Sequence, residues 1–226
     1  MPKQGKRLRS DREGWDNSVE LPLADALTRL QAFKKTKFDQ SIDIVMHLGI
    51  DSRHADQQIR GAIALPHGIG KTKRVVAFCA TDKVEACIAA GAIEAGGEEL
   101  VDKVAGGWMD FDVAVAQPQM MKVVSKLGRV LGPKGLMPAP KAGTVAADVE
   151  QAVKDYSAGK VEFRNDKEGN VHAVVGKMSF DNQKLVDNAQ AFIDAILKLK
   201  PASTKGHFVK KVAISGTMTP GVHVAV

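Results

Sequence analysis

Five basic side chains lie in a long stretch of the sequence that contains no acidic residue. Between residues 113 and 147 there is no Asp and no Glu. The basic residues of this stretch are Lys122, Lys126, Arg129, Lys134 and Lys141. A run of one charge sign can present a positive surface to the phosphates of a nucleic acid. Charge alone favours a simpler interpretation, in which these side chains belong to a solvated helix face and the loop after it.

Glycine and proline residues are concentrated in the same part of the chain. The segment Ser125–Val145 follows an expected basic helix. Its glycines and prolines disfavour regular secondary structure in this segment. They are Gly128, Gly132, Gly135, Gly143, Pro133, Pro138 and Pro140. A stiff, irregular loop of this kind can hold cations in fixed positions without an apolar core of its own. The composition therefore predicts an ordered basic loop and leaves its ligand open.

A glycine-rich segment before residue 73 resembles nucleotide-binding loops only in part. His67–Thr72 reads HGIGKT, but a phosphate-binding loop requires a glycine at the position of Leu65 and follows a strand, whereas this segment precedes one. A dinucleotide-binding fingerprint fails as well, because Lys73 stands in place of its third glycine. We therefore expect a flexible interdomain turn here. A nucleotide-dependent enzyme that uses the central part of the chain is the alternative function.

No other residue pattern indicates an active site or a metal site. None of the six histidines pairs with another at the spacing of metal ligands, and Cys79 and Cys87 lie eight residues apart on an expected strand and an expected helix. No nucleophile motif and no pair of catalytic acids stands out. We expect no catalytic residue, no metal and no cofactor, and hence no enzyme.

The cysteine content and the hydropathy of the chain predict where the protein acts. Two cysteines do not make a disulfide framework, and the beginning of the chain lacks the apolar core of a signal peptide. No run approaches the roughly 18–20 apolar residues that a membrane span needs. We expect a protein of the reducing cytoplasm without a membrane partner.

The net charge of +6 is concentrated at the two ends of the chain. The 226 residues include 32 basic and 26 acidic side chains, and this size and composition fit one or two globular domains. Residues 1–12 and residues 160–226 each carry a net charge of +4, residues 13–66 carry −2, and residues 67–159 are neutral. A general DNA-compacting protein needs an extended basic surface, so the neutral middle of the chain argues against that function.

Hydrophobic periodicity divides the chain into three parts. Alternating apolar residues between Ile42 and Ile50 predict a strand with one buried face, and the same period returns after Gly159. Between them, the continuous apolar run Val75–Ala80 and a second expected buried strand, Asp112–Ala116, alternate with helical segments, as in a layered α/β unit with a mostly parallel sheet. The expected helices are 21–33, 82–90, 98–104, 119–131, 148–156 and 181–199, and the remaining expected strands are a hairpin of 161–163 with 171–175, and 209–215.

Neither end of the chain can form a core alone, so we expect the two ends to fold together. They offer about two helices and four strands, enough for one α+β domain of the split-βαβ kind, built from residues 1–66 and 160–226. Residues 67–159 then form an inserted α/β domain. The two crossing segments, near 66–68 and 157–159, are expected to act as a hinge.

The basic loop and many other motifs resemble a known family. The run Ser125–Val145 is similar, almost residue for residue, to the signature of the L-one family of large-subunit ribosomal proteins, in its bacterial form. The resemblance covers essentially the whole chain, because further motifs follow in matching order and at matching spacing. They are GKR at 5–7, KFD at 37–39, LGID at 48–51, LPHG at 65–68, GGEE at 96–99, GWMDFD at 107–112 and VEFRNDK at 161–167.

The resemblance implies a fold, a function and a set of partners. The fold is a discontinuous α+β domain with an inserted, Rossmann-like, three-layer α/β domain. The implied function is that of a structural protein, a monomer when free, that binds large-subunit ribosomal RNA and forms a mobile stalk at the tRNA exit site. There it aids the release of deacylated tRNA. Bacterial members also repress translation by binding the leader of their own messenger RNA.

The resemblance also implies which residues contact RNA, all of them in the discontinuous domain. They are Lys37, Phe38, Arg164, Asp166, Lys167, Thr217 and Met218. Basic side chains suit phosphates, and Phe38 offers a flat apolar face for a ribose or a base, although its position alone suggests a core residue. The five cations of the acid-free stretch would form a secondary basic surface.

Three of the implied contact residues are neither basic nor aromatic, so their contacts with RNA would be of other kinds. Asp166 could accept a hydrogen bond from a 2′-hydroxyl or a base amino group, or it could simply form the turn. Thr217 could bond to backbone or ribose, and Met218 could pack under a sugar or a base. The family pattern then has glycine where this chain has Thr219. If that position needs a positive φ, or close approach to RNA, threonine there predicts a local rearrangement or weaker binding.

Overall fold

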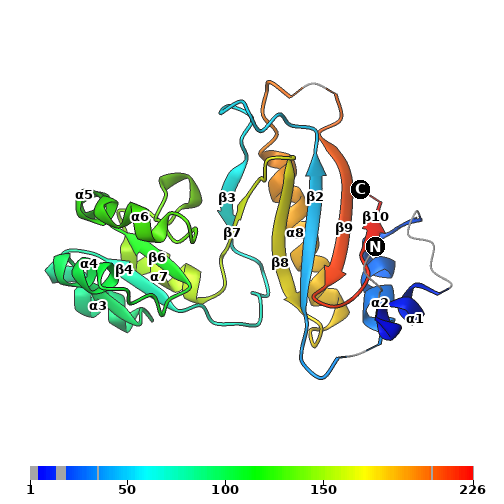
Figure 1. Ribbon diagram of the computed structural model, residues 1–226, viewed down its shortest axis with the longest axis horizontal. Coiled ribbons are helices and arrows are strands. Elements are labelled where there is room, and N and C mark those ends of the chain that lie inside the picture. The colour runs from blue at the N-terminus through cyan, green and yellow to red at the C-terminus, as the bar shows by residue number, and fades with distance from the viewer. Residues whose placement is uncertain (1–4, 14–18, 35, 205, 226) are drawn as a thin grey trace. The chain divides into compact units, whose positions relative to one another are not determined.

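The computed structural model describes residues 5–13, 19–34, 36–204 and 206–225 (Figure 1). The chain divides into two compact units, unit 1 from Met1–Gly70 with Phe163–Val226 and unit 2 from Lys71–Glu162. It passes between the units after Gly70 and after Glu162, whereas the predicted crossings were near 66–68 and 157–159. The predicted mixture of helices with parallel and antiparallel strands is confirmed.

Unit 1 is built on a five-stranded sheet with the strand order β1-β10-β9-β2-β8. Strand β1 pairs with β10 in parallel, and the other neighbours are antiparallel. The strands of unit 1 are β1 (Glu20–Leu21), β2 (Ser41–Leu48), β3 (Arg60–Ile63), β8 (Asn170–Lys177), β9 (Val209–Gly216) and β10 (Val222–Val224), and β7 (Val161–Arg164) spans its boundary. The helices are α1 (Lys6–Arg12), α2 (Leu23–Ala32) and α8 (Asn182–Lys198).

Strand β2 carries the alternation that the sequence predicted. Ile42, Ile44, Met46 and Leu48 are buried, and the residues between them are partly exposed. Helices α2 and α8 contact this sheet and lie behind it in Figure 1. The period-two pattern therefore places one face of β2 against the helices and leaves its other side chains on the opposite face.

The predicted hairpin of residues 161–163 with 171–175 is wrong. Strand β7 pairs with β3 in a separate two-stranded sheet, while β8 pairs with β2. The buried residue Asn165 explains the divergence, because its side-chain oxygen accepts from the N–H of Ile59 and its own N–H donates to the Ile59 carbonyl, both at 2.9 Å. These reciprocal bonds direct β7 toward β3, so only a single bridge from Asn165 to Val171 joins β7 to β8.

The segment predicted as a flexible interdomain turn is instead bound to helix α8. The fully buried Asn188 accepts from the N–H of His67 at 3.1 Å and donates to the carbonyls of Gly68 and Val175 at 2.9 and 2.8 Å. His67 Nε2 also lies 3.1 Å from a carboxylate oxygen of Asp187. This segment is therefore an integral part of unit 1, which the local sequence does not reveal.

Unit 2 contains a three-stranded parallel sheet with the order β5-β4-β6. Strands β4 and β6 are buried throughout, as their continuous apolar runs predicted. Val76 and Phe78 share a core with Val104, Leu127 and Leu131. The elements are β4 (Val75–Phe78), α3 (Val84–Ala89), β5 (Glu94–Gly96), α4 (Glu98–Ala105), β6 (Val113–Ala116), α5 (Met121–Val124), α6 (Gly128–Leu131) and α7 (Val149–Ser157).

The predicted continuous helix over 119–131 is a series of short turns. Helices α5 and α6 are separated by a 3-10 turn, Ser125–Leu127. The hydroxyl of Ser125 donates to the carbonyl of Lys122 at 2.7 Å, and Gly128, a poor helix former, begins α6. The basic side chains of this region therefore project from separate turns rather than from one regular helix face.

We expect Asn188→Ala to lower the free energy of unfolding more than the loss of an exposed polar side chain would. It removes three hydrogen bonds and leaves buried backbone groups unpaired, which costs about 1–3 kcal/mol. Urea unfolding measures the loss. The control is Gln190→Ala on the same helix, whose exposed side chain bonds, among the described residues, only to Asp194; an equal effect of the two substitutions would contradict this role of Asn188.

Both cysteines of unit 2 are expected to be unreactive in the folded protein. Burial raises the pKa of the Cys79 thiol and raises that of Cys87 to about 12, so very little thiolate exists near neutral pH. With a thiol reagent such as dithionitrobenzoate at about pH 8, we expect no fast reaction until denaturant is added. Rapid labelling of the native protein would show that these thiols are not shielded.

Candidate nucleic-acid interface

Four of the seven predicted RNA-contacting residues lie at the beginning of strand β2. Lys37 and Phe38 belong to the segment that leads from α2 into β2, and Thr217 and Met218 form the turn after β9. The N–H of Thr217 donates to the carbonyl of Ser41 at 3.0 Å, and the N–H of Ser41 donates to Thr217 Oγ1 at 3.2 Å. These bonds join the turn to β2 and bring the four residues to one end of the sheet.

The backbone of Met218 is held on both sides while its side chain stays accessible. Its N–H donates to Oε1 of the buried Gln40 at 2.8 Å, and its carbonyl accepts from the guanidinium of Arg7 in helix α1. The side chain is 49% exposed. Sequence reasoning missed Gln40 and Arg7 because each acts on the backbone of a residue far away along the chain, and no local pattern signals such a contact.

Thr219 fits the turn without backbone strain. No described non-glycine residue has a positive φ, so this position does not need glycine for its conformation. The N–H of Gly216 donates to Thr219 Oγ1 at 2.8 Å, and the N–H of Thr219 donates to the Gly216 carbonyl at 3.2 Å. The threonine therefore closes the turn, and the predicted rearrangement is not required. The other expectation, weaker RNA binding, stays a prediction.

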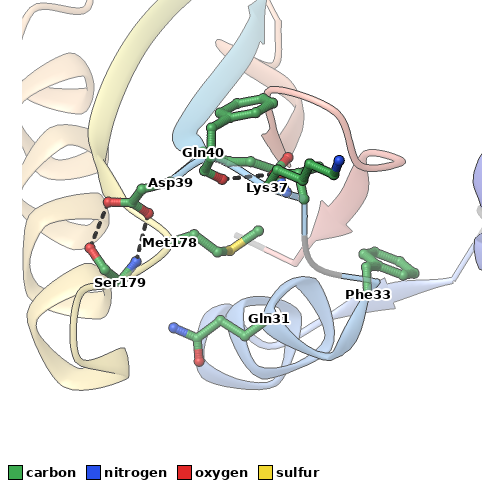
Figure 2. A pocket seen from close by; sticks show the side chains of 9 residues that line it. Gln31, Phe33, Lys37, Asp39, Gln40, Met178 and Ser179 are labelled. Carbon is green, nitrogen blue, oxygen red and sulfur yellow. Dashed lines mark hydrogen bonds between the residues drawn. The ribbon is translucent and has the colours of Figure 1, made fainter.

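A cavity of about 380 Å³ opens beside Lys37 and Phe38 (Figure 2). Phe38 is 53% exposed, so the core position that its place in the sequence suggested is wrong. The cavity wall is fixed by Asp39, whose carboxylate accepts from the N–H and the hydroxyl of Ser179 at 3.2 and 2.7 Å. Figure 2 shows this pair beside Met178, another lining residue. An apolar ring and a cation thus flank a preformed hollow.

The other three predicted residues lie at the opposite end of β2. Arg164 ends β7, and Asp166 and Lys167 form the turn between β7 and β8. The N–H of Leu48, the last residue of β2, donates to the carbonyl of Gly169 at 2.9 Å. Gly169 has a φ of +84°, and a Cβ there would lie 3.0 Å from the Leu48 carbonyl oxygen. Close approach of this turn to β2 therefore requires glycine.

Asp166 shapes the second turn through its carboxylate. One carboxylate oxygen accepts from the N–H groups of Glu168 and Asn170 at 2.9 and 2.7 Å, and the other accepts from the Asn170 amide at 2.9 Å. Burial raises the pKa of Asp166, but these hydrogen bonds outweigh it and hold the pKa below its ordinary value of 3.8. Of the two roles considered from sequence, turn formation is the one that these contacts support.

The two groups of predicted residues are separated by the length of strand β2. Eight residues at about 3.4 Å each give roughly 25 Å. Between the groups, Asp43, Val45 and His47 alternate with the buried residues and therefore lie on the other face of strand β2. A surface of this extent suits an extended, structured polyanion rather than a small ligand.

The five cations of the secondary basic surface are all exposed on unit 2, and none of their side chains has a hydrogen bond or ion pair within the described residues. The predicted ordering of their loop is confirmed. Thr144 Oγ1 accepts from the N–H of Ala139 at 2.8 Å, and the hydroxyl of Tyr156 donates to the carbonyl of Ala142 at 2.6 Å. These cations belong to a different unit from the seven predicted RNA contacts.

The glycine-rich segment near residue 70 shows packing rather than a nucleotide loop. Gly70 has a φ of +72°, and a Cβ there would lie 2.8 Å from the ring of Phe180. The amine of Lys73, at the position of the missing third glycine, donates to the carbonyl of Lys160 at 2.8 Å. The glycine thus serves close packing inside unit 1, which disfavours the alternative of a nucleotide-dependent enzyme.

Metal-ligand clusters and membrane-spanning helices would each indicate a further class of function. Within the described ranges, no three His, Cys, Asp or Glu side chains gather as metal ligands. In the same ranges, none of the helices combines the length and the apolar character that a bilayer crossing requires.

Exposed cations at both ends of strand β2, together with exposed apolar side chains at its beginning, form a surface suited to a nucleic acid. Comparison with known proteins then identifies the family. Residues 30–220 match the family described as Ribosomal protein L1p/L10e. The chain belongs to this family, which confirms the resemblance found in the motifs. Because these are structural ribosomal proteins, the prediction that the chain is not an enzyme is confirmed as well.

Two curated relatives match over nearly the full chain. One is the "Large ribosomal subunit protein uL1" of a Nocardioides species, which is 51% identical over 222 residues, 98% of this chain and 92% of the relative. The other is the protein of the same name from Nitratidesulfovibrio vulgaris, 50% identical over 224 residues, 99% of this chain and 95% of the relative.

We expect Asp166→Ala to loosen the turn that carries Lys167. The amides of Glu168 and Asn170 lose their acceptor and should exchange with solvent faster, as measured by NMR hydrogen exchange. In the unsubstituted protein, this carboxylate stabilises the fold above pH 3.8, and its contribution is lost as the pH falls through the lowered folded-state pKa. Glu168→Ala is the control; unchanged exchange in Asp166→Ala would contradict the assignment.

Proposed function

We propose that the protein is a structural component of the large ribosomal subunit and binds large-subunit ribosomal RNA through unit 1. The observation that carries this proposal is the position of the seven predicted contact residues. They are far apart in the sequence, yet they gather at the two ends of strand β2. The names of the relatives, each a large-subunit protein, supply the ribosomal context.

Charged and apolar contact residues are expected to bind different parts of the RNA. Lys37, Arg164 and Lys167 are exposed and have no ion pair within the described residues, so their charges are available for phosphates. Phe38 and Met218 offer exposed apolar surface for a ribose or a base.

Two further contact residues act chiefly by shaping the turns. Thr217 is bonded to Ser41, and Asp166 is bonded to Glu168 and Asn170. Their polar atoms hold the backbone that presents the neighbouring side chains. Recognition then depends on RNA shape, because rigid turns at both ends of β2 accept only a partner whose groups fit that separation.

The finer role follows from the family resemblance. Unit 1 acts as the RNA-binding domain and unit 2, residues 71–162, as the inserted Rossmann-like domain, with a hinge at the two crossings after Gly70 and Glu162. In this role the cytoplasmic protein, a monomer when free, forms the mobile stalk at the tRNA exit site and aids the release of deacylated tRNA. It also represses translation by binding the leader of its own messenger RNA.

Salt titration with matched nucleic acids tests RNA recognition. We expect tight binding to a structured fragment of large-subunit RNA, with an affinity that falls as salt rises because phosphate contacts release counterions. A DNA copy of the same stem should bind far more weakly, since it lacks the 2′-hydroxyls and the A-form shape. Equal affinity for the two would contradict recognition of structured RNA.

We expect Phe38→Ala to weaken RNA binding without affecting the fold. Loss of an aromatic stacking surface costs about 1–3 kcal/mol, which raises the dissociation constant roughly 5- to 150-fold. Because the ring is about half exposed, thermal stability should barely change. Leu199→Ala removes a similarly exposed apolar side chain at the end of α8 and is the control; equal losses from the two substitutions would show that Phe38 has no special place in the interface.

A further inference from the structure

Helix α1 is attached to the turn that presents Met218. The guanidinium of Arg7 donates to the carbonyls of Met218 and of Lys34, the latter at 3.5 Å. Two more bonds fix the helix, because the Lys34 amine donates to the hydroxyl of Ser10 at 2.9 Å and the Lys34 N–H donates to the carboxylate of Asp11 at 3.4 Å. Helix α1 therefore lies against the group of predicted RNA contacts at the beginning of β2.

The inner face of α1 is defined by Arg7 and the buried Asp11, one helical turn apart. At about 100° per residue, Lys6, Arg9 and Arg12 follow one another within about 120° on the other side of the helix. All three are exposed, and none of their side chains has a hydrogen bond or ion pair within the described residues. The helix beside the Met218 turn thus presents, on its side away from Arg7, three cations without a side-chain partner among the described residues.

We propose that helix α1 is part of the RNA-binding surface. Lys6, Arg9 and Arg12 contact phosphates of the RNA that the Met218 turn engages. Arg7 is a positioning residue, because it fixes the Met218 carbonyl while Gln40 fixes the N–H. The proposal rests on the proposed function and adds to it an N-terminal phosphate-binding element.

A purely structural role for these cations makes a different prediction. Arg9 and Arg12 lie in the last turn of α1, where positive charge stabilises a helix by interacting with its unpaired carbonyls. In that case their removal would lower the stability of the fold and leave the salt dependence of RNA binding unchanged. A phosphate-binding role predicts the opposite, since each phosphate contact contributes to the salt dependence.

The main test compares two triple variants of the full chain. In the first, Lys6, Arg9 and Arg12 are replaced by Gln; in the control, Lys184, Lys198 and Lys200, exposed lysines on and just after helix α8, are replaced by Gln, which removes the same charge. Binding to a large-subunit RNA fragment is measured between about 50 and 200 mM salt. We expect the slope of log affinity against log salt to become less steep by about 2–3 in the α1 variant only.

Two outcomes of this comparison would overturn the proposal. One is an unchanged slope and affinity in the α1 variant. The other is an equal change in both variants, which would indicate a general charge effect. Thermal unfolding of each variant identifies a folding defect, and Phe38→Ala is measured in parallel. If Phe38→Ala weakens binding and the α1 variant does not, only this inference fails; if neither has an effect, the proposed function fails too.

The role of Arg7 has a separate readout. Arg7→Lys keeps the charge but loses the planar pair of donors that reaches two carbonyls. We expect weaker RNA binding with an unchanged salt slope, together with faster hydrogen exchange of the amides at 217–219 in the free protein. Unchanged exchange and unchanged affinity would show that Arg7 does not position the turn.

Discussion

The proposed interface depends on the hydrogen-bonded pairing of strand β2 with β8 and β9. At its beginning, β2 holds the Thr217 turn through Ser41, and at its end it holds the Gly169 turn through Leu48. The burial of alternate β2 side chains on one face of the sheet fixes the register of this pairing, because a slip of one residue would expose the whole apolar set. The separation of the two groups of contact residues is therefore set by the core of unit 1.

A common arrangement links the two ends of β2. Polar groups that shape the turns are bonded within the protein, as in Gln40 with Met218 and Asp166 with Asn170. The cations beside them, such as Lys37 and Lys167, are exposed and have no ion pair within the described residues. Binding then costs little ordering of the backbone, and the charges meet phosphates without first breaking an ion pair.

Helices and strands with a clear hydrophobic pattern were predictable from the sequence. The pairing of segments that lie far apart in the sequence was not. Periodicity located β2, β4, β6 and α8, because burial of one face or of both faces leaves a direct trace in the residue pattern. The hairpin failed because Asn165 bonds to Ile59, more than a hundred residues earlier. The family motifs predicted Phe38 and Met218 as contact residues. Arg7 and Gln40 bond to the backbone of a residue far away in the sequence, so only the structure identifies their role.

Hydrogen exchange of the full chain, free and bound to a structured large-subunit RNA fragment, tests the central claim most directly. The claim is that RNA lies along unit 1 and engages both ends of β2. It predicts that bound RNA slows exchange in the segments 36–40, 164–170 and 216–219 together. Protection confined to the basic loop of unit 2, residues 125–145, with none at the ends of β2, would contradict it.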